Sequence, residues 1–432
     1  MRHRDRRNGI AFMPKVISPS EFVDLLKPEM KVFIQGCTAE PPTLLDALTA
    51  SPESSKGVEY VGVPLPGYNK FDPAALHPEA RMITFFMTPE LRRSSAAERI
   101  RFIPLHYSGI YRYLKSMPDL DMVLVQAAAG DRDGRCSFGL TSEHAPGALE
   151  SARTVVVEMN SAIPFTNCEP DLPLDRIDYI VESNRAPPTF PSPQRGEQAE
   201  AVGRNAASLI HDGDVLQIGI GRLQSAVMRE LRTHRDLGFH SGLISDETLD
   251  LVEAGALTGA KKSIDPGIIV TGAVFGSERL HDFATDESVR MHGVGYTHEV
   301  PIIATIDNFV SINGGMMVDL YGQIVADNLR GRQITAPGGY SDFQRGARLA
   351  NGGRSIVLMT SASPDGARSN IISALPAGSV VTGTRSDTDY VVTDHGVADL
   401  RHKDMDEKAK AIISIAHPDF REQLERDWHE RS

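Results

Sequence analysis

The chain has 432 residues, a length that suggests roughly two to three domains. Apolar residues make up 41% of it and charged residues 24%, which is ordinary for a globular protein. The formal net charge of −12 argues against a general binder of nucleic acids or of membrane surfaces. It does not exclude a local basic pocket for an anionic ligand.

Cysteine spacing and hydropathy exclude further classes of protein. Cys37, Cys136 and Cys168 are far apart and have no metal-ligand spacing, so we expect a reduced, cytoplasmic setting and no metal site. No apolar run reaches the roughly 18 residues that a membrane span needs. Residues 1–12 are basic but lack a long apolar core, so we expect a disordered tail and not a secretory signal.

The first half of the chain alternates short apolar strands with helices. Ser18 and Glu21 have the spacing of a capping box, which predicts a helix over residues 18–26. A second helix is expected from Thr43. Strands are expected at residues 31–34, 58–63, 121–126, 154–158 and 178–182.

Residues 185–195 contain four prolines and separate the two halves. So many prolines disfavour helix and sheet, and they are typical of a semi-rigid spacer. We therefore predict an N-terminal domain over residues 13–184 and a C-terminal domain over residues 196–432. Strands alternate with helices in both halves, which predicts α/β domains with mainly parallel sheets and helices on both faces.

The second half begins with a predicted helix over residues 196–211, followed by the stretch 214–250, around which the chain is organised. That stretch indicates a strand at 215–218, a turn with Gly219 and Gly221, a helix at 224–231 and a second strand at 239–244. Ser245 or Asp246 is expected to cap a helix that starts near Glu247. Further on, strands are expected at 268–274 and 309–313, with a helix at 277–283 between them.

A strand, a glycine turn and a helix N-terminus form a site for anions, because free backbone N–H groups point outward there. The alternative is an ordinary α/β turn without a ligand. A dinucleotide fingerprint would need a third glycine, and Gln224 stands in its place. A nicotinamide-dependent dehydrogenase would therefore rest on Gly219 and Gly221 alone.

Several blocks of the chain resemble the acetyl-CoA hydrolase/transferase family, which includes 4-hydroxybutyrate, butyrate and succinyl CoA-transferases. The most specific blocks are Val318-Asp319-Leu320 with Gly322-Gln323, and Gly338-Gly339 followed by Asp342-Phe343 and Arg345-Gly346-Ala347. A further block is the family's Q-x-G-I-G turn, which here begins at Gln217. The resemblance extends over nearly everything from Met13 onward. It implies two tandem, doubly wound domains of the CoA-transferase type.

The resemblance also implies the site. A coenzyme A thioester would be a substrate, no cofactor would be bound permanently, and the acyl acceptor would be a small carboxylic acid of the acetate, butyrate or 4-hydroxybutyrate kind. The family further suggests a homodimer or larger homo-oligomer. Gly338 and Gly339 would supply amides to an oxyanion. The residues implied to bind coenzyme A are Gln217, Ile218, Gly219, Ile220, Gly221, Met316, Gly338 and Gly339.

The family's nucleophile is the glutamate of an H-[ST]-E-x-x-S-D block, and the matching stretch here starts His240-Ser241-Gly242. In the family that glutamate attacks the thioester and forms a mixed anhydride, then an enzyme–CoA thioester, which divides one difficult step into easier ones. Gly242 has no side chain, so it cannot do this.

Three interpretations of Gly242 stay open. Another carboxylate, Asp246 or Glu247, could attack, although both positions also suit a helix cap and first turn. Water could attack instead, with a base such as His240, in an acyl-CoA hydrolase. The protein could also bind acyl-CoA without turnover. If the rest of the site is intact, Gly242→Glu is expected to raise transferase activity. The phosphates of coenzyme A would need cations, for which Arg222, Lys261 and Lys262 are candidates, although the two lysines also suit a solvated surface.

Overall fold

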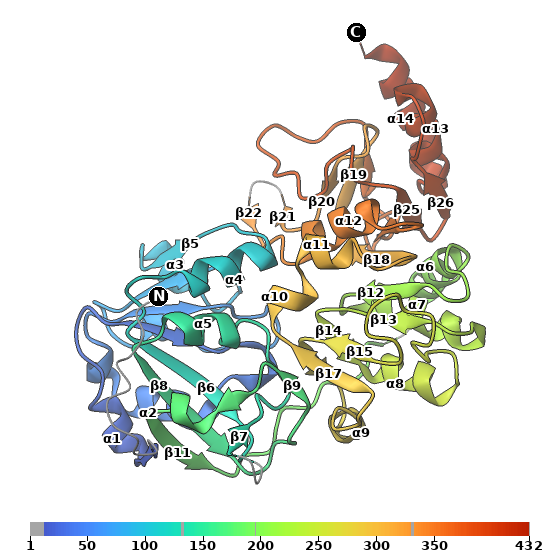
Figure 1. Ribbon diagram of the computed structural model, residues 1–432. Coiled ribbons are helices and arrows are strands. Elements are labelled where there is room, and N and C mark those ends of the chain that lie inside the picture. The colour runs from blue at the N-terminus through green and yellow to red at the C-terminus, as the bar shows by residue number, and fades with distance from the viewer. Residues whose placement is uncertain (1–12, 131–133, 195, 330–331, 432) are drawn as a thin grey trace.

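The computed structural model describes residues 13–130, 134–194, 196–329 and 332–431. The tail predicted at residues 1–12 lies outside the described residues, as does residue 195 at the end of the predicted spacer. Within the described ranges, no helix is both long and apolar enough to cross a membrane. The predicted α/β class with mainly parallel sheets is confirmed (Figure 1).

An eight-stranded, fully parallel sheet forms the first part of the molecule. Its strand β2 illustrates why helices cover both faces: Phe33 packs with α4 and α5, and Val32 and Ile34 pack with α1 and α2. The short helix α3 precedes the last strand. The strands in sheet order are β1 (Lys15–Val16), β11 (Tyr179–Ser183), β8 (Thr154–Asn160), β6 (Met122–Ala127), β2 (Lys31–Ile34), β3 (Glu59–Gly62), β4 (Arg81–Thr84) and β5 (Ile100–Phe102). The helices are α1 (Pro19–Val23), α2 (Pro42–Ala50), α3 (Arg92–Ala96), α4 (Tyr107–Lys115) and α5 (Ala145–Ser151).

A six-stranded sheet forms the second part, and all its pairs are parallel except the last. Helices α6 and α7 cover one face, and α11, α12 and α13 cover the other. The sheet order is β13 (Gly238–Phe239), β12 (Val215–Ile218), β18 (Phe309–Gly314), β23 (Arg354–Leu358), β25 (Tyr390–Thr393) and β26 (Gly396–Asp399). The helices are α6 (Glu197–Ala207), α7 (Arg222–Glu230), α8 (Asp246–Glu253), α9 (Glu278–Phe283), α10 (Val294–Thr297), α11 (Val300–Ile303), α12 (Tyr340–Leu349), α13 (Met405–Ser414) and α14 (Pro418–Glu430).

A small three-stranded sheet joins the two parts. Strand β9 comes from the first half but pairs with β17 of the second, and α10 lies between the two parts in Figure 1. The domain boundary predicted at the Pro-rich segment stays a prediction, since β9 lies before that segment in sequence and pairs with β17 after it. The remaining strands are β7 (Arg135–Cys136), β9 (Cys168–Glu169), β10 (Leu172–Pro173), β14 (Leu243–Ser245), β15 (Ile269–Thr271), β16 (Ala273–Phe275), β17 (Val289–His292), β19 (Met317–Asp319), β20 (Ile324–Val325), β21 (Asn328–Leu329), β22 (Arg332–Gln333) and β24 (Ile371–Ile372).

Each large sheet has one point where the chain reverses its direction across the sheet. This switch point lies between β2 and β6 in the first sheet and between β12 and β18 in the second. Ligands of open α/β sheets bind beyond the carboxyl ends of strands at such points. Residues 35–39 follow β2 and residues 219–221 follow β12, so both loops are expected at a site.

The strand predicted over residues 239–244 is wrong, because the structure has two short strands, β13 and β14, in different sheets. The N–H of His240 donates to a carbonyl of β12 and that of Ser241 to a carbonyl of β15, both at 3.0 Å. The chain thus leaves one sheet for another at this point. Gly242 lies in the crossing.

The strand predicted over residues 268–274 is divided in the same way. Gly272 separates β15 from β16, and its N–H donates to the carbonyl oxygen of Gly242 at 3.1 Å. A side chain on Gly272 would lie 2.9 Å from that oxygen. Two glycines therefore let these segments approach closely beside the switch point.

The carboxylate of Asp342, in the first turn of α12, ties the two parts together. It accepts the backbone N–H of Ser108 at 3.0 Å and the Ser108 hydroxyl at 2.8 Å, at the start of α4. Asp342 is only 4% exposed. This contact explains an aspartate in the sequence block that begins at Gly338.

We expect Asp342→Ala to lower the free energy of unfolding by about 1–3 kcal/mol, since a buried N–H and a hydroxyl lose their acceptor. Asp342→Asn keeps one acceptor oxygen and should cost less. Urea unfolding of the three proteins measures both differences. Equal stability of the alanine variant and the wild type would show that this contact does not join the parts.

Candidate functional site

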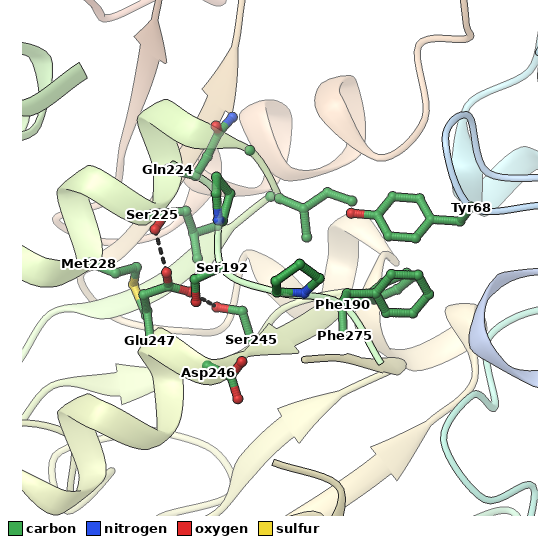
Figure 2. A pocket seen from close by; sticks show the side chains of 16 residues that line it. Tyr68, Phe190, Ser192, Gln224, Ser225, Met228, Ser245, Asp246, Glu247 and Phe275 are labelled. Atoms are coloured by element: carbon green, nitrogen blue, oxygen red, sulfur yellow. Dashed lines mark hydrogen bonds between the residues drawn. The ribbon is translucent and has the colours of Figure 1, made fainter. Parts of the chain in front are cut away.

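A crevice lies beyond the carboxyl end of β12, at the switch point of the six-stranded sheet (Figure 2). Its volume is about 130 Å³. The glycine turn predicted from the sequence forms one side of it. The lining residues are 190–193, 218–221 and 245–247, together with Tyr68, Gln224, Ser225, Met228 and Phe275.

The glycine turn leads directly into α7. Gly221 is the N-cap of that helix with a φ of 139°, a backbone conformation that side chains disfavour. A Cβ atom there would also lie 2.6 Å from Oε1 of Gln224. The turn therefore needs glycine, and it presents the first amides of α7 to the crevice.

Aromatic rings form the opposite wall. The ring of Tyr68 packs edge-on against Phe190 at 4.6 Å and against Phe275 at 4.8 Å between centroids. The N–H of Phe190 donates to the carbonyl of Gly276 at 2.9 Å. The Pro-rich segment, predicted as a spacer, thus contributes a wall of the crevice.

The two carboxylates proposed from the sequence as replacement nucleophiles both reach the crevice. Asp246 accepts the hydroxyl of Ser277 at 2.7 Å, at the N-terminus of α9. Glu247 accepts the hydroxyls of Ser245, at 2.9 Å, and of Ser225 (Figure 2). Hydrogen bonds that hold neighbouring elements together therefore occupy both groups.

Other residues implied to bind coenzyme A lie outside the crevice. The Gln217 side chain is buried, and its Oε1 accepts Nδ2 of Asn313 at 3.1 Å, which joins β12 to β18. Met316 lies in the turn after β18, where its N–H donates to Val325 at 2.8 Å. The structure gives both residues a role in the sheet and its turn, and their contact with a ligand stays a prediction.

Gly338 and Gly339 lie at the start of α12, and Gly339 faces Gly242 across one histidine. A Cβ on Gly339 would lie 2.6 Å from Cδ2 of His298, and one on Gly242 would lie 2.7 Å from Cε1 of the same ring. The carbonyl of Gly338 accepts the N–H of Tyr107 at 3.0 Å. The imidazole of His298 thus fills the space between the two glycine positions.

His298 is fixed on several sides. Its Nδ1 lies 2.8 Å from the Thr297 hydroxyl, and its ring packs against Tyr107 at 4.7 Å and Phe343 at 4.4 Å. Burial lowers the pKa of His298 well below its ordinary value, so the ring is neutral at pH 7. A longer side chain at position 242 would have to displace this ring.

His240 does not suit the role of base for an attacking water. It is fully buried, and its Nε2 lies 3.2 Å from the carbonyl oxygen of Thr297. Burial lowers its pKa to about 3. The histidine is therefore a neutral core residue.

The two lysines proposed for the phosphates have other partners. Nζ of Lys261 lies 3.0 Å from Asp236, and the buried Lys262 donates to the carbonyls of Phe239 and Ile268. Lys262 thus has a structural role. Arg222 is exposed at the first position of α7, beside the mouth of the crevice.

A cluster that the sequence analysis missed lies beside Gly242. Glu143, Cys37 and Tyr107 face one another, and each is less than a tenth exposed. Burial raises the pKa of Glu143 to about 7, while hydrogen bonding from Cys37 and Tyr107 opposes that rise. Nothing in the spacing of these three residues along the chain marks them as neighbours.

No group of three or more His, Cys, Asp or Glu side chains is arranged to hold a metal ion in the ranges that the structure describes.

Comparison with known proteins gives matches over most of the chain. The model of the acetyl-CoA hydrolase/transferase N-terminal domain matches residues 1–190, and that of the C-terminal domain matches residues 276–428. The chain is 34% identical over 423 residues to a 4-hydroxybutyrate coenzyme A transferase of Clostridium kluyveri, covering 97% of this chain and 98% of that protein. It is 36% identical over 339 residues to a butyryl-CoA:acetate CoA-transferase of Anaerostipes caccae, covering 76% of each.

The fold is similar to that of RipA from Yersinia pestis. The TM-score is 0.90 at 27% identity, covering 96% of this chain and 97% of that one.

The contact between Gly242 and His298 predicts that substitutions at these two positions have non-additive effects on the free energy of unfolding. We expect Gly242→Ala to lower the free energy of unfolding by about 1–3 kcal/mol, because a methyl group overpacks against a fixed ring. In a His298→Ala background the same change should cost little, and urea unfolding of the four proteins measures the coupling. Gly242→Glu alone is now expected to destabilise the protein without raising activity. Additive effects of the two alanine substitutions would contradict this packing.

The raised pKa of Glu143 predicts that the free energy of unfolding depends on pH. The folded state holds the proton of an acid with a raised pKa more tightly, so the stability that Glu143 contributes is present at low pH and is lost as pH rises through about 7. Relative to wild type, Glu143→Gln should gain roughly 2–3 kcal/mol of unfolding free energy between pH 5 and pH 8.

Urea unfolding at both pH values checks this difference. Burial also raises the pKa of Glu40 to about 7. Because Glu40 is present in both proteins, its contribution to the pH dependence cancels in the difference between their unfolding free energies. A stability difference that does not change with pH would contradict the burial of an ionisable Glu143.

Proposed function

This chain belongs to the acetyl-CoA hydrolase/transferase family, and on that premise we propose that it cleaves an acyl-CoA thioester and either transfers coenzyme A to a small carboxylic acid or passes the acyl group to water. The resemblance found in the sequence blocks is confirmed by the two family matches. Proteins named as CoA-transferases match over most of the chain. A non-catalytic binder is not favoured, and the family matches lend no support to a nicotinamide enzyme.

The observation that carries the proposal is the chemistry of the crevice. Its volume of about 130 Å³ is smaller than the roughly 300–1,000 Å³ of drug-sized sites, so it suits a slender chain and not a nucleotide. Tyr68, Phe190 and Phe275 offer an apolar wall. The carboxylates of Asp246 and Glu247 would repel phosphates but can accept amide N–H groups. These features support the pantetheine arm as the occupant.

We place the phosphates of coenzyme A at the mouth of the crevice. The amides at the start of α7 and the exposed Arg222 favour negative charge there. The pantetheine arm would then pass Ile220 towards Gly242, where the thioester would lie.

Transfer and hydrolysis differ in the acceptor. The named relatives transfer coenzyme A to carboxylates, namely 4-hydroxybutyrate or acetate by their names. We propose an acceptor of the same small class for this chain, and we also propose a cytoplasmic homo-oligomer. Water is the second candidate acceptor, because position 242 has no carboxylate side chain that could attack the thioester.

The test is an assay of purified protein with acetyl-, butyryl- and succinyl-CoA, each with acetate, butyrate or 4-hydroxybutyrate as acceptor. We expect a new acyl-CoA to form in at least one combination, measured by chromatography, with free coenzyme A reporting hydrolysis. Coenzyme A binding without turnover in every combination would contradict the proposal.

The glycine turn offers a matched pair of variants. Gly221→Ala places a methyl group against Gln224 at the crevice, and we expect it to raise the KM for acyl-CoA about tenfold or more, which corresponds to about 1.4 kcal/mol. Gly255→Ala is the control, because Gly255 also has a positive φ, of 72°, but has no atom within 4 Å of its Cβ position. Steady-state kinetics compare the two. An unchanged KM in Gly221→Ala would exclude the turn from the binding site.

A further inference from the structure

Position 242 lacks a side chain, and the side chain of Glu143, from the first half of the chain, lies near it. The atoms closest to the Cβ position of Gly272 include the carbonyl oxygen of Gly242 at 2.9 Å and Cγ of Glu143 at 3.3 Å. Glu143 and Gly242 therefore border the same point, from opposite halves of the chain.

Glu143 is held in this place by backbone contacts with the second half. Its carbonyl accepts the N–H of Val294 at 2.8 Å, and the N–H of Ser142 donates to Gly272 at 2.9 Å. The segment before α5 is thereby fixed against β16 and α10. The position of the carboxylate relative to Gly242 thus does not depend on a mobile loop.

Two members of the cluster have unfavourable backbone conformations. Glu143 has a φ of 33° and Cys37 a φ of 57°, both in the left-handed region that non-glycine residues rarely adopt. Such a conformation is unfavourable and persists where surrounding structure imposes it, most often at functional sites. Asn69 imposes it on Cys37, since its side chain binds both the N–H and the carbonyl of Cys37 at 3.0 Å.

The cluster adjoins the wall of the crevice through Cys37. Cys37 packs in one apolar group with Phe275, Tyr68 and Ile220, which line the crevice, and with Leu243. Gly242 and Leu243 are partly exposed. Cys37 therefore contacts both the wall of the crevice and Glu143.

The groups that face Glu143 suit a nucleophilic carboxylate. Cys37 and Tyr107 can donate hydrogen bonds but stay uncharged, since burial raises the pKa of both well above its usual range. The neighbouring His144 and His298 are neutral, because burial lowers their pKa values. No cation among these four groups neutralises the carboxylate, and a poorly solvated carboxylate is the more reactive one.

We propose that Glu143 is the carboxylate that accepts the acyl group, and that it replaces from the first half of the chain the side chain absent at Gly242. This inference rests on the proposed function. In the family the nucleophile lies in the block that begins at His240. Here the enzyme would be a transferase whose nucleophile lies just before α5 instead.

The steps balance with no co-reactant beyond the two substrates. An oxygen of Glu143 attacks the thioester carbon and the C–S bond breaks. Coenzyme A leaves as a thiolate, and the acyl group and Glu143 are left as a mixed anhydride. The thiolate then attacks the Glu143 carbonyl carbon, and the first acid leaves as its carboxylate. The acceptor carboxylate attacks the resulting glutamyl–CoA thioester, and the same two exchanges in reverse give the new acyl-CoA and free Glu143.

The test combines chemical trapping of the glutamyl thioester with an isosteric substitution of Glu143. The wild type is incubated with the acyl-CoA that it turns over best and reduced with borohydride, which converts a glutamyl thioester to an alcohol that mass spectrometry can locate. We expect the modified residue to be Glu143. Glu143→Gln should lower the transfer rate roughly 1,000-fold with no modified residue, and Glu143→Asp should keep a measurable rate.

A matched control and the pH profile separate chemistry from folding. Glu182→Gln makes the same chemical change on an exposed strand residue and should leave the rate unchanged. Transfer per folded molecule should rise as pH increases through about 7, as Glu143 ionises.

Each other outcome is decisive. A modified Asp246 or Glu247, wild-type rates in Glu143→Gln, or steady turnover with no modified residue would overturn the role of Glu143 and leave the proposed function standing. A wild type that binds coenzyme A but turns over no acyl-CoA would overturn both.

Discussion

The close approach of backbone segments around His298 is the constraint on which this site depends. Gly242 and Gly339 both lack the Cβ that would collide with the ring, and Gly272 lets the crossing strand reach Gly242. Nearby, the switch-point loops of the two sheets, one from each half, meet where Cys37 and Ile220 pack in one apolar group. Because ligands of such sheets bind at switch points, the packing that joins the halves also creates the place for chemistry.

The sequence predicted the class of fold, most strands of the first sheet and the glycine turn, since short apolar runs between turn residues are local signals. It failed at residues 239–244 and 268–274, where the chain changes sheets in mid-run. An apolar strand pattern is the same in one sheet or in two, so only tertiary pairing decides. The Pro-rich segment likewise resembled a spacer, because its role as a crevice wall depends on Phe190 meeting Tyr68 and Phe275.

The candidate site was predictable only in part. The glycine turn, Asp246 and Glu247 lie within one short stretch, and the structure brings them together. Glu143 is about 100 residues away in sequence from Gly242, and no local pattern marks a lone glutamate before a short helix as reactive. Its signals are burial, a positive φ and the two polar neighbours Cys37 and Tyr107, all of which exist only in the folded protein.

The central claim is spatial: with the pantetheine arm in the crevice, the thioester lies beyond it, against the carboxylate of Glu143 near Gly242. A crystal structure of the protein with a non-cleavable thioether analogue of acyl-CoA tests it most directly. The account predicts the pantetheine arm between the glycine turn and Phe275, with the atom that replaces the thioester carbon in contact with a Glu143 oxygen. An analogue bound with that atom against Glu247, or with its pantetheine arm outside the crevice, would contradict the account.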